Sequence, residues 1–239
     1  MNPYDREAFA EMQAWRRAMQ RPPTVSGRLT RRVQERINEL IPERVHEFIT
    51  AAFKKMTQAV LAGSDFVTAD PVREGSLQVR EDRVKDRIQF YKTAAAAEGA
   101  VTGFGGILLG LADFPLWLTL KMKMLFDIAA LYGHDTGELS ERLYILHVFQ
   151  LAFSSRQHRK KIFADVAGWD ARMRDKKADI ESIDWRAFQQ EYRDYIDLAK
   201  LLQLVPGIGA AVGAVVNHRY TEKLGRTAMN AYRMRGFMR

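Results

Sequence analysis

The chain has 239 residues and a formal net charge of +8, with 47% hydrophobic and 28% charged residues. This composition is typical of a globular protein of one or at most two domains, and it excludes both a wholly disordered chain and an integral membrane bundle. The chain has no cysteine, which excludes disulfides, zinc–thiolate sites and a cysteine nucleophile and fits a reducing compartment.

The N-terminus predicts a helix over Pro3–Gln20, with apolar residues along one side. The segment before Pro22 has no apolar core of signal-peptide length, so we expect no export by that route. We expect residues 1–22 to form an appended helix and residues 23–239 to form one helical domain.

Two further helices are expected before the first clear break. One covers Thr24–Leu40, and Pro42 fits the first turn of the next, which runs to about Leu61. Periodicity then disappears over Gly63–Gly75, where Gly, Pro, Ser and Asp cluster. We interpret this segment as a loop between helical halves, because the following Val79–Lys92 is again helical.

The most unusual stretch is Thr93–Leu120, which carries only two charges, Glu98 and Asp113. Four of its five glycines are spaced so that they share one face of a helix. A glycine costs about 1 kcal/mol inside a helix relative to alanine, so this spacing predicts close approach by another helix or a flat apolar ligand. The four glycines are Gly99, Gly103, Gly106 and Gly110.

A helix break and a return arm follow. Asp113 can cap the helix whose body is Leu116–Leu131, and Gly133 fits the left-handed position after its end. Glu138–Phe153 predicts another amphipathic helix, for which Thr136 is the expected cap.

The C-terminal third alternates charged and apolar segments. Arg156–Lys177 is highly charged with few apolar anchors, and Trp185–Leu204 predicts a helix. Val205–Val216 is uncharged and has Gly209 and Gly213 four residues apart, and a basic helix, Asn217–Met234, follows. No strand-like alternation or long repeat appears.

The predicted fold is therefore all-α. We expect a single multi-helix bundle with a central apolar, glycine-rich helical hairpin, in which the two glycine-bearing segments meet at the core.

The sequence is compatible with three relations of the chain to a membrane. Val101–Leu120 has the length of a membrane span, but Asp113 and Pro115 interrupt it. The alternatives are a true span, peripheral or partial insertion, and a soluble bundle with an unusually apolar centre.

Three segments resemble the core of the EcsC family: IPERVHEFITAA (Ile41–Ala52), the glycine-rich Glu98–Asp135 and the C-terminal Val205–Arg235. The resemblance extends from about Ile41 to Arg235, and its EGxxTGxGG…DxP part is fairly specific. It implies an all-helical bacterial protein, cytoplasmic or peripheral at the inner face of the membrane. The family takes its name from a gene beside an ABC transporter, and the resemblance implies no established activity or catalytic residues.

Glu98 and Asp113 are the first candidate site residues, because a buried carboxylate must be paired or protonated. They form either a polar cluster that binds a head group or metal, together with Gly99, Gly103 and Gly106, or a structural ion pair and a helix cap. Candidate partners are Lys92, Lys121, Lys123, Arg219 and Arg226.

Histidine and arginine supply the other candidates. His147 lies in an apolar helix and is either a ligand-binding or a core residue. Asn217, Arg219 and Arg226 follow the second glycine segment. Their side chains either bind a phosphate or carboxylate, or they belong to a helix that passes from the core to the surface. A di-metal helix site needs two Glu-x-x-His pairs, and the sequence has one, so we expect no metal and no cofactor.

The leading functional expectation is a non-enzymatic helical protein that binds a hydrophobic or lipid ligand or docks on an anionic membrane. One alternative is an enzyme for a small amphipathic substrate, in which Glu98, Asp113 and His147 converge. The other is an adaptor for a transporter or secretion system, with a membrane protein as partner. P-loop and Gly-x-Ser-x-Gly motifs are absent, and no basic helix has the context of a nucleic-acid recognition helix, so we expect no specific nucleic-acid partner.

Overall fold

The computed structural model of the chain describes residues 1–21, 43–63, 66, 70–103, 114–154, 158–175 and 209–238. These ranges are helical with no strand, which confirms the all-α class. The expected helices over Thr24–Leu40 and Trp185–Leu204 lie outside them. The helices are α1 (Pro3–Gln20), α3 (Glu43–Ala62), α4 (Leu77–Gly103), α6 (Phe114–Leu131), α7 (Leu139–Phe153), α8 (Arg159–Ala167), α9 (Trp169–Asp175) and α11 (Gly209–Phe237).

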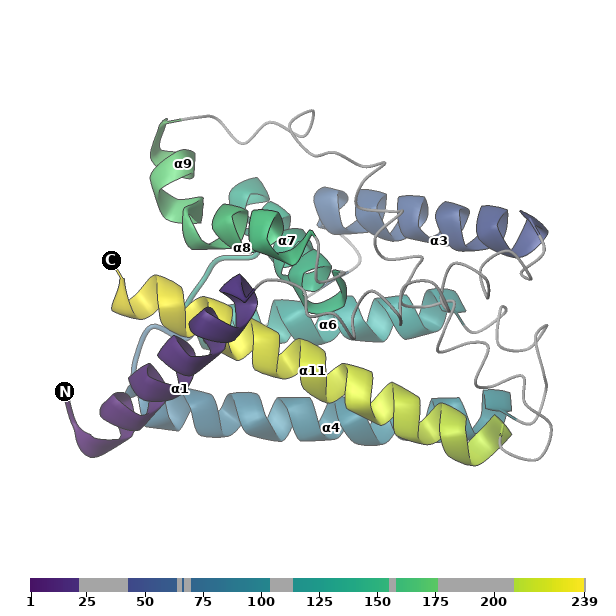
Figure 1. Cartoon of the computed structure of the whole chain (residues 1–239), viewed down its shortest axis with the longest axis horizontal. Helices are drawn as coiled ribbons and strands as arrows, with labels where there is room; N and C mark the ends of the chain where they lie inside the picture. The colour runs from purple at the N-terminus through teal and green to yellow at the C-terminus, as the bar shows by residue number, and fades with distance from the viewer. Residues whose placement is uncertain are drawn as a thin grey trace.

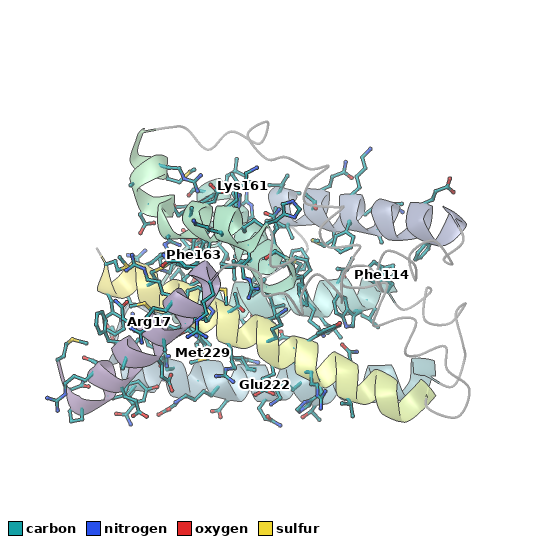
Figure 2. The ribbon with its side chains drawn as sticks, viewed as in Figure 1. Arg17, Phe114, Lys161, Phe163, Glu222 and Met229 are labelled. Carbon is teal, nitrogen blue, oxygen red and sulfur yellow. The ribbon has the colours of Figure 1, made fainter. Side chains whose placement is uncertain are left out.

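Two long helices, α4 and α11, run antiparallel along one side of the bundle (Figure 1). Figure 2 labels Glu222 on α11, where this helix passes along α4. Each step toward the end of α4 corresponds to a step toward the start of α11. Three pairs define this register: Glu81–Arg233, Ile88–Gly225 and Lys92–Glu222.

The two helices approach closely at Gly225. A Cβ atom at this position would lie 2.6 Å from Cγ1 of Ile88, a distance that real side chains do not tolerate. Gly225 was not selected from the sequence, although the physical reason expected for the other glycines applies to it.

The same register brings the predicted glycine segments to one end of the pair. Gly99 and Gly103 lie in the last turns of α4, opposite the first turns of α11, which contain Gly209 and Gly213. The tip of the predicted hairpin, residues 104–113, is outside the described ranges. The hairpin, with Gly106, Gly110 and Asp113, therefore stays a prediction.

The core forms where α6 and α7 pack against α3, α4 and α11. Apolar residues on several sides of α6 are buried, including Leu118, Met122 and Leu125, and α7 is buried in the same way from Leu143 to Phe153. Within the described ranges, no helix combines the length and apolarity needed to cross a membrane.

Helix α1 lies across the C-terminal part of α11 (Figure 1). Met12 is fully buried, Phe9 packs edge-on against Phe237 at 5.4 Å, and Trp15 packs against Phe163 at 5.6 Å between ring centroids. These contacts attach α1 to the rest of the bundle. The predicted division at residue 22 stays a prediction.

The turn after α6 forms as expected at Gly133, which has a φ of +86° and suits a residue without a side chain. The expected cap of α7 is wrong. Glu138, not Thr136, occupies the N-cap position, and its side chain makes no cap hydrogen bond. A turn in which Asp135 Oδ1 accepts from Gly137 N at 2.8 Å sets where α7 begins.

Arg233 fastens the end of α11 to α4. Its guanidinium donates two hydrogen bonds, of 2.7 and 2.6 Å, to the carboxylate of Glu81, which is fully buried. Tyr4 and Tyr132 donate to the same carboxylate. Burial acts to raise the pKa of Glu81, but the hydrogen bonds from Arg233 and Tyr4 outweigh it, so the pKa lies below its ordinary value.

Candidate functional site

One end of the bundle collects the first turns of α3, α6 and α11 (Figure 1). Figure 2 shows Phe114, which opens α6, at this end. Each of the three helices exposes a large apolar side chain here: Phe48 is 39%, Leu116 53% and Val215 49% exposed. We call this surface, defined by Phe48, Leu116 and Val215, the apolar end.

Ring contacts and hydrogen bonds link the three helix starts. Phe53 of α3 packs edge-on against Phe114 of α6 at 5.7 Å between ring centroids. Trp117 of α6 donates its indole N–H to Asn217 of α11. Because these two contacts join the three helices near their starts, Phe48, Leu116 and Val215 lie at the same end of the bundle.

Cations follow the apolar side chains along the same helix faces. Lys55 comes seven residues after Phe48, and Arg219 comes four residues after Val215, spacings that keep the side chains on one face. Both cations are exposed. At about 1.5 Å per residue, they lie about 6–10 Å behind the apolar side chains.

Helix α6 repeats this spacing in a weaker form. Lys123 comes seven residues after Leu116 but is half-buried and forms an ion pair with Asp127. Arg226 of α11 is exposed and lies two turns beyond Arg219 on the same side of the helix. The apolar end is therefore backed mainly by the cations of α3 and α11.

A compact aromatic layer lies beneath the apolar end. Phe114 stacks on Trp117 at 5.9 Å, Trp117 contacts Phe153 at 6.1 Å, and Phe153 packs edge-on against Tyr220 at 5.8 Å. Such ring pairs contribute about 0.5–1.5 kcal/mol each beyond their buried area. They hold the starts of α6 and α11 against the end of α7.

A buried polar cluster accompanies these rings. Asn217, 5% exposed, accepts a hydrogen bond of 3.1 Å from Nζ of Lys121, which is 1% exposed. The ammonium also lies 4.8 Å from the ring centre of Trp117. The predicted site residue Asn217 thus stabilises a buried cation and the indole N–H between α6 and α11.

The other predicted residues divide by location. Glu98, Gly99 and Gly103 lie in the last turns of α4, at the same end of the bundle as the apolar end. The side chain of Glu98 is outside the described part of the chain. Gly106 and Asp113 are also outside it. The glycines and Glu98 therefore share an end of the bundle with Asn217 and Arg219, and their joint role stays a prediction.

His147 lies apart from this group. Its Nδ1 is 2.9 Å from the carbonyl oxygen of Leu143, and its ring packs against Trp169 at 4.9 Å. Burial lowers the pKa of His147, which favours the neutral ring. Its described contacts are to α7 and α9, whereas those of Asn217 are to α6.

Metal ligands do not gather in the described ranges, where no group of three His, Asp or Glu side chains is placed to hold an ion. In the described part of the chain, the apolar end presents exposed apolar side chains with cations nearby. It contains no general acid–base pair among these residues. Such a surface can bind an amphipathic, negatively charged structure.

Sequence reasoning missed the exposure of Phe48 and Leu116. Phe48 shares a helical face with Ala52 and Met56, both buried, so periodicity alone predicts that it is buried. The start of α3 extends beyond the contact of Phe53 with Phe114, and Phe48 is therefore exposed to solvent. The available signal was the position of Phe48 and Leu116 near the starts of their helices.

Comparison with known proteins matches the chain to one family and to two bacterial proteins. The EcsC protein family matches residues 6–237. Protein EcsC of Bacillus subtilis (strain 168) is 45% identical over 222 residues, which cover 92% of this chain and 91% of that protein. Uncharacterized protein YdbA of the same strain is 28% identical over 231 residues, covering 92% and 85%. No solved structure matches the chain.

Proposed function

The chain belongs to the EcsC family, and from this premise we propose that it is a non-enzymatic helical protein that docks through its apolar end on an anionic membrane surface. One observation carries the proposal: three helices expose Phe48, Leu116 and Val215 at one end of the bundle, with exposed cations behind them. The net charge of +8 agrees in sign with an anionic partner.

The spacing of apolar and basic side chains suits the depth of a membrane interface. Apolar side chains of interfacial helices enter about 5–10 Å into the boundary between head groups and acyl chains. Lys55 and Arg219 would then lie at the level of the phosphates, where each cation contributes about 1 kcal/mol.

The expected affinity is moderate and reversible. Full burial of a large apolar side chain contributes about 1.5–3 kcal/mol, and the exposed parts of Phe48, Leu116 and Val215 supply a fraction of that each. Apolar and electrostatic contributions must therefore act together, so we expect binding to anionic vesicles only and weaker binding at high salt.

Vesicle flotation tests the proposal. The protein is mixed at low salt with vesicles of phosphatidylcholine alone or with phosphatidylglycerol, and the floated fraction is measured. We expect flotation only with phosphatidylglycerol. The variant Phe48→Ser/Leu116→Ser should bind about tenfold more weakly or worse, because two apolar side chains no longer enter the interface.

A matched control is Val79→Ser/Phe90→Ser, which removes one aliphatic and one phenylalanine side chain that are 48% and 59% exposed on α4. It should float like the unmodified protein, and melting temperatures should show that both variants are folded. Near-zero flotation with both lipid mixtures, or equal losses in the two variants, would refute docking through the apolar end.

A further inference from the structure

A cleft of about 1160 Å³ opens at the other end of the bundle. It lies beyond the last turns of α6 and α11, and α6 alone, with 18 residues, separates it from the apolar end by about 27 Å. The turn after α6, the start of α7, the short helix α9 and the end of α11 line it. The membrane-docking proposal does not use this cleft.

Arg235 holds one wall of the cleft together. It donates one hydrogen bond of 2.7 Å to Glu141 and two, of 3.0 and 2.7 Å, to Asp170. Tyr232 donates to the other oxygen of Glu141 at 2.7 Å, and Nδ1 of His134 lies 3.4 Å from the same carboxylate. The charged and polar groups on this wall form hydrogen bonds with one another. Arg235 is therefore already paired with carboxylates and is not available to bind an anion.

The lining of the cleft is acidic, although the chain as a whole is basic. Its lining contains four carboxylates, from Asp135, Glu138, Glu141 and Asp170, against the guanidinium groups of Arg73 and Arg235. Arg235 is shared between Glu141 and Asp170. Asp135 and Glu138 are exposed and form no ion pair with any residue in the described ranges, so they give the cleft an excess of negative charge.

Flexible apolar side chains form another part of the lining. Met173 is half-buried and Met238 is 52% exposed. Methionine side chains adapt to varied apolar partners and are common on surfaces that bind many peptides. Combined with the exposed carboxylates of Asp135 and Glu138, they suit a cationic group carried on an apolar stem, as in lysine and arginine.

The size of the cleft favours a peptide over a small amine. Sites for small molecules are typically clefts of about 300–1000 Å³ that enclose most of the ligand. Here the space is larger, and its rim residues Asp135, Glu138 and Met238 are exposed. A chain segment with several side chains can occupy such a space while remaining connected to the rest of its protein.

We infer that this cleft binds a basic amphipathic peptide segment of a partner protein, with cations of the segment on Asp135 and Glu138 and its apolar side chains on Met173 and Met238. The overall charge of +8 repels cationic peptides elsewhere on the surface, so the acidic lining selects the place of binding. This inference is independent of membrane docking and is tested without lipid.

The test measures fluorescence anisotropy of a labelled short peptide of lysine and leucine titrated with the full chain. The variant Asp135→Asn/Glu138→Gln should bind about tenfold more weakly, since two ion pairs contribute about 1.4 kcal/mol together. The control Glu7→Gln/Asp86→Asn removes one exposed carboxylate from α1 and one from α4, neither of which lines the cleft, and should bind as the unmodified chain does.

Two further arms complete the experiment. The methyl signals of Met173 and Met238, assigned with Met→Leu variants, should shift when the peptide is added. Spermidine should compete weakly, because it lacks apolar side chains. No binding of the peptide, equal weakening in both carboxylate variants, unmoved methionine signals, or spermidine competing as well as the unlabelled peptide would each overturn the inference.

Discussion

The replacement of Gly225 by alanine tests how closely α4 and α11 pack. The added Cβ would lie 2.6 and 2.7 Å from Cγ1 and Cδ1 of Ile88 and 3.0 Å from Cγ2. Ile88 is 7% exposed and β-branched, so its side chain has little freedom to turn away. We therefore expect the helices to separate locally or Ile88 to adopt a strained rotamer.

Two opposing contributions set the magnitude. Overpacking of a well-packed interface costs about 1–3 kcal/mol. Alanine inside a helix is favoured over glycine by about 1 kcal/mol. The free energy of unfolding of Gly225→Ala should therefore lie between the unmodified value and about 2 kcal/mol below it.

Gly236→Ala isolates the steric contribution. Gly236 lies in the last turn of the same helix, and a Cβ atom there would meet nothing within 4 Å. This variant should be unchanged or more stable by up to about 1 kcal/mol. The difference between the two variants, measured by urea unfolding followed by circular dichroism, should be about 1–3 kcal/mol.

Ile88→Ala provides the second control, because it removes all three atoms that the new Cβ would meet. In that background Gly225→Ala should cost little or be stabilising, which gives a coupling free energy of about 1–3 kcal/mol. The reasoning is refuted if Gly225→Ala and Gly236→Ala have the same stability, or if the cost of Gly225→Ala is the same with and without Ile88.

Four other substitutions follow from buried polar groups. Arg233→Met should lower the free energy of unfolding by about 3–5 kcal/mol, because it leaves the buried carboxylate of Glu81 without its guanidinium; a loss below about 1 kcal/mol in urea unfolding would contradict this. The pKa of Glu81 is lowered in the folded chain, so stability is lost as the pH falls below about 4.5, and Glu81→Gln should make the acid unfolding curve shallower. Asn217→Leu should cost about 1–3 kcal/mol by removing an acceptor from buried Lys121, and an unchanged melting temperature would argue against that role. The folded pKa of His147 lies below 6.5, so protonation favours the unfolded chain and stability falls as the pH drops through about 6.5; His147→Gln should reduce this slope, and an identical slope would exclude the effect.

Most helix boundaries could be predicted because they depend on neighbouring residues. The predicted helix Pro3–Gln20 matches α1, with Asn2 accepting a hydrogen bond from Asp5 N at its start. The end of α6 follows from Gly133, whose positive φ favours glycine over any other residue. The cap of α7 was predicted wrongly because the turn at Asp135 moves the helix start to Leu139.

The candidate site was only partly predictable. Arg219 and Asn217 lie in the last helix as expected, one exposed and one buried. The apolar periodicity of α3 could not show that Phe48 is exposed, because exposure depends on where the neighbouring helix begins. The acidic cleft was missed because its carboxylates come from separate elements, each of which is unremarkable alone.

Taken alone, the sequence determined the helical class, the family resemblance and most described helix limits, since periodicity, proline, glycine and capping residues act within a few positions of the chain. Only the tertiary structure decided which charges are buried and which apolar residues are exposed. Glu81 and Arg233 are 152 positions apart, and Gly225 requires its small size because of Ile88 on another helix. Such contacts depend on how whole helices pack, and no local pattern contains that information.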